Sequence, residues 1–277
     1  MERADHGKRF LIAWLALSVV ATPLVAIFLG DVFPPGDASA QATQQTFDNS
    51  WLTAIMTPPA LFVVVFLVYA LTSFRARTTE VVDGPPARGD ARIQTLWMAI
   101  TGVIVLFLAA FGSYELVQSG AGGGQGPNAA FQPAGYSKAM EVQVIGQQWE
   151  FTYRYPSYGG VEVPHLVLPA NTLIRLDVTS LDAVHSFWAY QLGVKADANP
   201  GVANIAYVQT KGPMKFDIHC AELCGLWHGY MFDTGNVVDP GQFASWIKRQ
   251  QSYFAPVMKY LPPYASSYLP DPQERAG

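Results

Sequence analysis

The residues best suited to chemistry lie in one short stretch, CAELCGLWHGYM, at positions 220–231. It holds the chain's only two cysteines, Cys220 and Cys224, followed by His228 and Met231. Thiolate, imidazole and thioether groups together favour copper, and a thioether is a typical weak axial ligand of electron-transfer copper. A mononuclear blue-copper site needs one cysteine, whereas two bridging thiolates can hold a pair of coppers, each capped by one histidine.

The second histidine of such a site must come from elsewhere in the chain. His6 precedes the first apolar stretch, and His165 is typical of a strand edge. His219 is adjacent to Cys220, so in an extended segment it points to the opposite face. His185 follows an alternating stretch and suits a ligand at the end of a neighbouring strand. His185 is therefore the favoured partner of the loop.

Two other interpretations of the cysteine pair stay open at this point. A disulfide is favoured on the oxidising side of a membrane. A zinc site with two cysteines and two histidines is also common. The disulfide leaves both His228 and Met231 without a role, and zinc leaves Met231 without one.

The composition indicates a membrane protein. The chain is 50% hydrophobic and 14% charged, against roughly 25% charged in a soluble domain. Residues 10–29, 58–74 and 96–116 form apolar stretches that approach the roughly 20 residues needed to span a bilayer. The net charge of −4 provides no chain-wide basic field, so nucleic-acid binding is excluded.

The basic residues predict the orientation, because they are retained on the cytoplasmic side. No Lys or Arg occurs in residues 30–50. We therefore expect residues 30–50, and everything after Leu116, on the periplasmic side of a bacterial-type plasma membrane. The basic residues that flank the apolar stretches on the other side are Arg3, Lys8, Arg9, Arg75, Arg77, Arg88 and Arg92.

Residues 1–40 have two interpretations, a signal peptide or an extra transmembrane helix. Ala38-Ser39-Ala40 before Gln41 is an A-x-A cleavage pattern. The apolar core, however, is longer than the roughly 7 to 15 residues usual in a signal peptide.

The rest of the chain divides into four predicted parts. Residues 41–118 are a two-helix anchor, with helices at about 52–74 and 96–117, and residues 119–135 are a Gly-rich linker. Residues 136–240 alternate apolar and polar side chains between turns, which predicts a β-sandwich or barrel. Residues 241–277 are a short helix and an extended Pro- and Tyr-rich tail. The predicted strands are 141–145, 151–155, 173–179, 206–209, 214–218 and 235–238.

The loop follows the pattern C-x-E-x-C-G-x-x-H-x-x-M, and the sequence resembles subunit II of the haem-copper cytochrome c oxidases from about residue 51 to 250. The segments LDAVHSFW, LGVKADANPG and GQQWEFTYRY carry the same resemblance. It implies a transmembrane helical hairpin, plus an N-terminal signal or third helix, followed by an all-β cupredoxin-like Greek-key sandwich. The implied function is to accept electrons from cytochrome c and to pass them to haem in subunit I, where oxygen is reduced to water and protons are translocated.

The resemblance also implies a dinuclear CuA centre. Cys220 and Cys224 would bridge the two coppers, and the side chain of Glu222 would also reach a magnesium or manganese ion at the contact with subunit I. The remaining implied ligands are His185 and His228 through nitrogen, Met231 through its thioether and Glu222 through its backbone carbonyl.

Aromatic residues alternate in GQQWEFTYRY, which predicts that they share one strand face. Phe151, Tyr153 and Tyr155 are expected in the core. By the resemblance, Trp149 is the exposed aromatic residue at which cytochrome c hands over its electron.

Two features depart from the family. Gln94, in IQTLW, stands where relatives carry a glutamate at the mouth of a proton channel, and an amide cannot exchange a proton as a carboxylate does. Residues 119–277 carry 12 acidic and 10 basic side chains, a net charge of −2, so the steering of a basic cytochrome is weak. A membrane-tethered c-type cytochrome is therefore an alternative donor.

The expected partners are subunit I, subunit III, lipid and a separate donor protein, since the chain has no C-x-x-C-H motif for covalent haem. The competing interpretation is a membrane-anchored copper chaperone with a thioredoxin fold, which is not itself an enzyme. Such proteins place the histidine after the cysteine pair and need helices between strands, whereas His185 comes first here.

Overall fold

The computed structural model describes residues 5–29, 32, 36–74, 89–119, 135–202, 204–258 and 260. Most of the predicted linker, three of the flanking arginines (Arg75, Arg77 and Arg88), Arg3 and nearly all of the tail lie outside these residues. The chain forms two compact units, residues 1–33 with 47–113 and residues 34–46 with 114–277. Each is described by itself.

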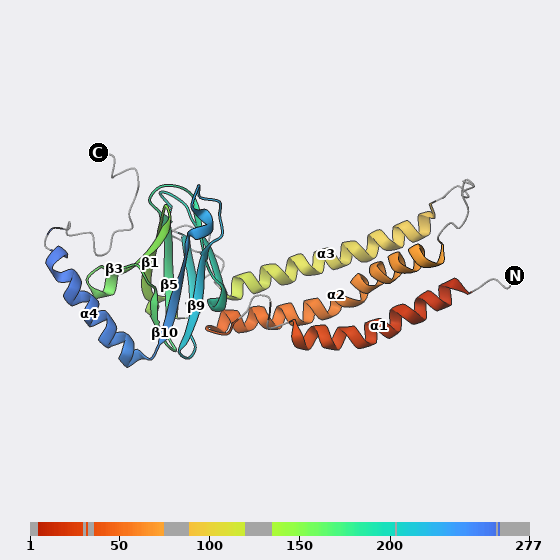
Figure 1. Ribbon diagram of the computed structural model, residues 1–277, viewed down its shortest axis with the longest axis horizontal. Coiled ribbons are helices and arrows are strands. Elements are labelled where there is room, and N and C mark those ends of the chain that lie inside the picture. Colours follow the sequence, from red (N-terminus) through yellow and green to blue (C-terminus); the bar gives the residue numbers. More distant parts are fainter. Residues whose placement is uncertain are drawn as a thin grey trace. The chain divides into compact units, whose positions relative to one another are not determined.

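The first unit consists of long apolar helices (Figure 1). Their mean hydropathies of 2.4, 2.2 and 2.1 are sufficient for membrane spans. Side chains such as Val19 and Leu106 are exposed, as expected for residues that face lipid. The indole of Trp14 donates a hydrogen bond to the carbonyl of Pro58 and so links two of the helices. The three helices are α1 (His6–Phe28), α2 (Ala40–Ser73) and α3 (Ala91–Ser119).

The predicted membrane spans are present, but α2 begins at Ala40 instead of near residue 52. Its first turns are polar, so hydropathy alone does not reveal them. They are helical because Ser39 caps the helix, its hydroxyl accepting a hydrogen bond from the Ala42 backbone at 3.0 Å.

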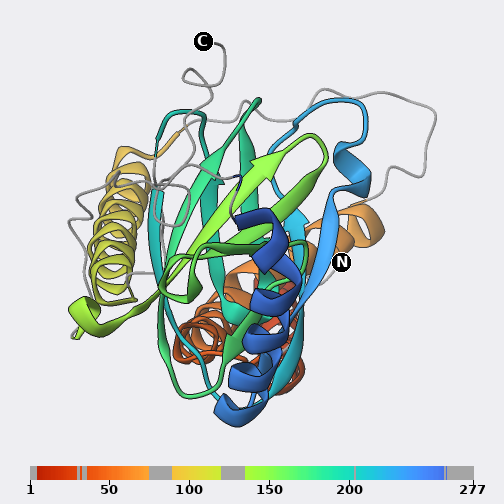
Figure 2. The ribbon, with the colours of Figure 1, turned by 90° about the vertical axis from the view of Figure 1, so that its left-hand side faces the viewer.

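The second unit is a sandwich of two five-stranded sheets (Figures 1 and 2). The β1–β5 and β4–β10 pairs are parallel, and the other pairs are antiparallel. One sheet has the order β3 (Val161–Val163), β2 (Glu150–Tyr155), β1 (Met140–Gln147), β5 (Leu173–Ser180) and β8 (Asn204–Gln209). The other has the order β4 (Val167–Pro169), β10 (Phe232–Val238), β9 (Met214–Cys220), β6 (His185–Ala189) and β7 (Val194–Ala198).

Alternate residues of the strands fill the space between the sheets. Val142, Val144 and Leu176 come from one sheet, and Phe187 and Ile218 from the other, and all five are fully buried. This core positions the strand ends that carry the candidate site.

One α-helix and four 3₁₀ helices complete the described part of the second unit. In α4 (Pro240–Met258) Phe243 and Ile247 are buried on one face and Trp246 packs against the core, as the spacing predicts. At 19 residues, α4 is longer than the short helix expected at the start of residues 241–277. The 3₁₀ helices are η1 (Tyr136–Lys138), η2 (Pro156–Tyr158), η3 (Tyr190–Leu192) and η4 (His228–Tyr230).

All six predicted strands are present, and Phe151, Tyr153 and Tyr155 are buried as expected. Trp149, however, lies in the turn before β2 and not on the strand itself. The strands β3, β4, β6 and β7, which are three to five residues long, were not predicted.

Candidate metal centre

The loop 221–231 joins two neighbouring antiparallel strands. Cys220 ends β9, and β10 begins at Phe232, opposite His219. The Cys220 amide donates to the Met231 carbonyl at 3.0 Å, which closes the loop. The Ala221 amide donates to the Ser186 carbonyl at 2.9 Å and ties the loop to β6. Because β6 begins at His185, this histidine is brought to the loop.

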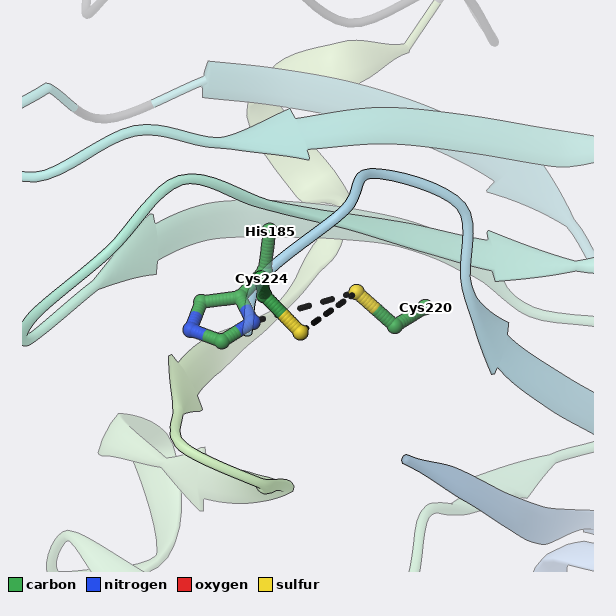
Figure 3. Close-up of side chains that lie close together, drawn as sticks. All are labelled: His185, Cys220 and Cys224. Carbon is green, nitrogen blue, oxygen red and sulfur yellow. Dashed lines mark hydrogen bonds between the residues drawn. The ribbon is translucent and has the colours of Figure 1, made fainter. Parts of the chain in front are cut away.

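Six potential ligand groups converge there. The Cys220 Sγ lies 3.7 Å from the Cys224 Sγ and 3.8 Å from the His185 Nδ1 (Figure 3). The Cys224 Sγ lies 3.5 Å from the His228 Nδ1 and 3.7 Å from the Met231 Sδ. The Glu222 carbonyl oxygen is 3.2 Å from the Cys220 Sγ. The loop and β6 therefore bring together all the residues that the sequence singled out as ligands.

The two cysteines are not joined to each other. Their sulfurs are 3.7 Å apart, whereas a disulfide bond is about 2.05 Å long, and both are free cysteines. The combination of two thiols, two imidazole nitrogens, a thioether and a carbonyl fits a pair of copper ions. A single tetrahedral zinc would leave the thioether unused.

Asp182 orients His185. Its Oδ1 lies 2.9 Å from the His185 Nε2, which leaves the Nδ1 free to face the sulfurs. The carboxylate is itself held by the backbone amides of Gln148 at 2.7 Å and Ala183 at 2.6 Å. A carboxylate bound to the remote nitrogen of a ligating histidine is a common device for fixing its tautomer. Asp182 was not among the predicted site residues, although its position three residues before His185 was a usable signal.

The electrostatics of this pair follow from the same contacts. Burial lowers the pKa of His185, but the hydrogen bonds with Cys220 and Asp182 outweigh it and raise the pKa. Burial raises the pKa of Asp182, yet the hydrogen bonds from His185 and from the amides of Gln148 and Ala183 bring the pKa below its ordinary value. Asp182 is thus an anion, and its negative charge stabilises positive charge at His185 and at the candidate site.

The pKa values of the two thiols differ strongly. Burial raises the pKa of Cys220, but hydrogen bonds from His185 and from backbone groups overcome it and lower the pKa to about 6. Burial, followed by the charge of Cys220, raises the pKa of Cys224 to about 12. Metal binding at both sulfurs therefore releases the proton of Cys224.

Trp149 touches the loop directly and is half-buried, not exposed as the resemblance implied. Its indole N–H donates to the Cys224 carbonyl at 3.2 Å, and the side-chain amide of Gln148 donates to the same oxygen at 2.8 Å. Gly225 has φ +114°, and a Cβ there would lie 3.0 Å from the Gln148 amide nitrogen and 3.5 Å from the indole. The close approach of the aromatic ring to the loop therefore requires a glycine.

Beyond Gly225 the loop presents an apolar surface to solvent. Leu226 is 83% exposed, Tyr230 71% and Trp227 49%, and the rings of Trp227 and Tyr230 are in edge contact, with centroids 5.5 Å apart. We call these three residues the apolar face. They were not among the predicted site residues, because exposure cannot be read from residue type.

The other histidines do not join the site. The ring of His219 lies between those of Tyr190 and Phe232, on the face opposite to Cys220, as predicted. His165 is exposed and pairs with Asp233 at 2.7 Å. The side chain of Glu222 is exposed.

Comparison with known proteins gives two family matches. Residues 26–116 match the family model described as cytochrome c oxidase subunit II, transmembrane domain, and residues 161–237 match the one described as its periplasmic domain. Cytochrome c oxidase subunit 2 of Synechocystis sp. is 28% identical over 84% of this chain and 80% of that protein. The protein of the same name from Thermostichus vulcanus is 28% identical over 90% of this chain and 88% of that protein.

Among solved structures, the periplasmic domain of subunit II (CoxB) of Bradyrhizobium japonicum is 31% identical, with a TM-score of 0.41, over 42% of this chain and 95% of that one. The two family models match separate segments, one over the helices and one over the strands and loop, in the order that the structure has them. With its helices, its β-sandwich and its converging thiols, the chain belongs to the cytochrome c oxidase subunit II family and is part of an oxidoreductase complex, with the copper centre that this family implies.

Proposed function

We propose that this chain accepts single electrons from a c-type cytochrome and passes them to haem in subunit I of a respiratory oxidase. The observation that carries the proposal is the convergence of the six ligand groups within 3.2–3.8 Å contacts on one loop and one strand end. Such a donor set is suited to electron transfer rather than to bond chemistry, because no open position for a substrate is implied.

In this proposal Cys220, Cys224, His185 and His228 would hold the two coppers through sulfur and nitrogen. Met231 and the Glu222 carbonyl are the weak ligands. When bound, the copper pair supplies reversible one-electron chemistry. The chain's own residues keep the site rigid: the loop is closed by backbone hydrogen bonds and His185 is held by Asp182. Little therefore has to move when the charge changes.

Trp149 is the proposed point at which electrons arrive. Its ring is half-buried, and its N–H is bonded to the carbonyl of a proposed bridging ligand, Cys224. This gives a short path of covalent bonds and one hydrogen bond from the aromatic ring to a sulfur. The apolar face adjoins this path through Gly225 and is the proposed docking surface for the donor.

The wider assignments follow the family. We propose that residues 136–240 form the copper domain on the periplasmic side, with a two-helix membrane anchor in residues 41–118. Subunits I and III are the proposed partners. The exposed carboxylate of Glu222 is available to a magnesium or manganese ion at the contact with subunit I. Oxygen reduction and proton translocation belong to the complex, and Gln94 requires a proton route that uses another group.

The substitution Trp149→Phe tests the electron path. It removes the indole N–H but keeps an apolar ring, so the copper ligands stay in place. We expect unchanged copper absorption and electron spin resonance, with hyperfine structure from one electron shared by two copper nuclei. The value of kcat/KM for cytochrome c should fall about tenfold or more, which corresponds to about 1.4 kcal/mol in the activation free energy.

The matched control is Trp246→Phe, since Trp246 is also half-buried but lies on α4 and packs on Tyr155. It should leave kcat/KM unchanged. If both variants were equally active, Trp149 would not lie on the electron path. A spectrum from one isolated copper, or a protein that binds only zinc, would refute the dinuclear centre itself.

A further inference from the structure

Residues 36–45, which we call the strap, lie far before the β-strands in sequence and yet are part of their unit. Residues 34–46 group with 114–277. The Ala38 amide donates to the Gln191 carbonyl at 2.9 Å, and the Lys211 amide donates to the Ala38 carbonyl at 2.9 Å. Ser39 forms an antiparallel bridge with Thr210. The strap thus adds a short piece of backbone pairing between η3 and the end of β8.

Side chains fasten the strap further. The Ser39 hydroxyl donates to the Leu192 carbonyl at 2.7 Å. The Gln45 amide donates to the Gly193 carbonyl at 2.7 Å, and the Gln41 side-chain oxygen accepts from the Gln209 amide at 2.9 Å. As a result Ala38 and Ser39 are 0% exposed and Ala42 is 2% exposed.

An ion pair closes the outer edge of the strap. The Lys211 ammonium lies 2.7 Å from both oxygens of Asp37, which also accepts a hydrogen bond from Thr43. The hydrogen bond from Lys211, followed by that from Thr43, lowers the pKa of Asp37. Both charged groups are partly exposed, so this ion pair contributes less to the stability of the strap than the buried contacts of Ala38 and Ser39 do.

The strap contains the A-x-A pattern Ala38-Ser39-Ala40. We propose that these residues are a built-in element of the β-sandwich, and that the bond between Ala40 and Gln41 stays intact in the mature protein. Cleavage there would remove the partners of the Lys211 amide and of the Gln191 and Leu192 carbonyls. It would also leave a charged amino group at Gln41, which is 9% exposed. Unpaired buried polar groups and buried charges are costly.

The first test is the N-terminus of the full-length protein after expression and purification from membranes. Intact mass and N-terminal sequencing should give a chain that begins at or before Asp37. A mature chain beginning at Gln41 would overturn the proposal.

The second test compares two glycines that close 3₁₀ helices. Gly193, after η3, has φ +61°, and Gly159, after η2, has φ +77°. A Cβ at Gly193 would lie 2.8 Å from the Cα and N of Ala42, whereas a Cβ at Gly159 meets nothing within 4 Å. Gly193→Ala and Gly159→Ala therefore carry a similar backbone penalty, and only the first pushes against the strap.

Hydrogen exchange of the full-length protein measures how strongly each variant loosens the strap. Amides of Ala38, Ala42 and Lys211 should be protected in the unmodified protein. They should exchange about tenfold faster in Gly193→Ala than in Gly159→Ala, since overpacking of this kind loosens local structure. Equal exchange in the two variants, or unprotected amides in the unmodified protein, would show that the strap is not part of the fold. Neither test uses copper, so each stands apart from the proposed electron transfer.

Discussion

At the scale of single residues, the site depends on groups that do not themselves bind metal. Asp182 holds the Nε2 of His185 and is itself held by two backbone amides. Such partners commonly change metal affinity by about 10- to 100-fold when they are removed. Asp182 is thus a positioning residue, whose charge also acts on the potential of the site.

The change Asp182→Asn keeps the shape and removes the charge. We expect copper affinity to fall about 10- to 100-fold. The reduction potential should rise, because a negative partner stabilises the more positive oxidised state. A redox titration and competition with a copper chelator measure the two effects. Asp217→Asn, on an exposed carboxylate of β9, is the control and should change neither. If the reduction potential were equal in both variants, Asp182 would have only a structural role.

The convergence of the candidate ligands could be predicted from sequence because Cys220, Cys224, His228 and Met231 are closely spaced on one loop. Asp182 left a signal in its position three residues before His185. Gln148 left none, since its role depends on a turn that brings its side-chain amide to the Cys224 carbonyl. The same reason explains why the position of Trp149 in a turn was not predicted, although its role was proposed from the resemblance.

At the scale of elements, β4 is held by a side chain from the other sheet. The Tyr155 hydroxyl donates to the Val167 carbonyl at 2.9 Å and accepts from the Val167 amide at 3.0 Å. Both groups are buried. β4 is only three residues long and was not predicted, whereas β1 and β5, eight residues each, overlap the predicted strands 141–145 and 173–179.

Tyr155→Phe tests this tether. The change leaves the amide and carbonyl of buried Val167 without their partner, which costs about 1–3 kcal/mol. Thermal unfolding of the β-sandwich, followed by near-ultraviolet circular dichroism of the full-length protein in detergent, should occur at a lower temperature. Tyr153→Phe is a closely matched control on the same strand. Tyr153 is equally buried, and within the described part of the chain its hydroxyl has no hydrogen-bond partner. Its removal should be neutral or stabilising, and equal losses in both variants would contradict the tether.

At the scale of the whole molecule, composition predicted the membrane spans, because hydropathy is a property of local sequence. The strap could not be predicted, since it pairs residues 36–45 with residues about β8 and η3 that lie far along the chain. Backbone pairing between such distant segments leaves no pattern in either one.

The charge of the outer part of the chain bears on how a donor docks. With 12 acidic and 10 basic side chains in residues 119–277, the net charge is −2, and the apolar face beside Trp149 is exposed. Steering by charge is therefore weak, and contact with Leu226 and its neighbours should provide most of the binding. Turnover with a basic soluble cytochrome c should change little as salt is added.

Leu226→Ser should raise KM for that cytochrome about five- to tenfold, because an apolar contact is lost, while kcat and the rate with a small-molecule reductant stay the same. Met214→Ser, at the far end of β9 from Cys220, is the control and should leave KM unchanged. A steep fall of turnover with ionic strength, together with an unchanged KM in Leu226→Ser, would show instead that charged side chains dock the donor. Loss of turnover with the small reductant as well would point to damage at the copper site and not at the docking surface.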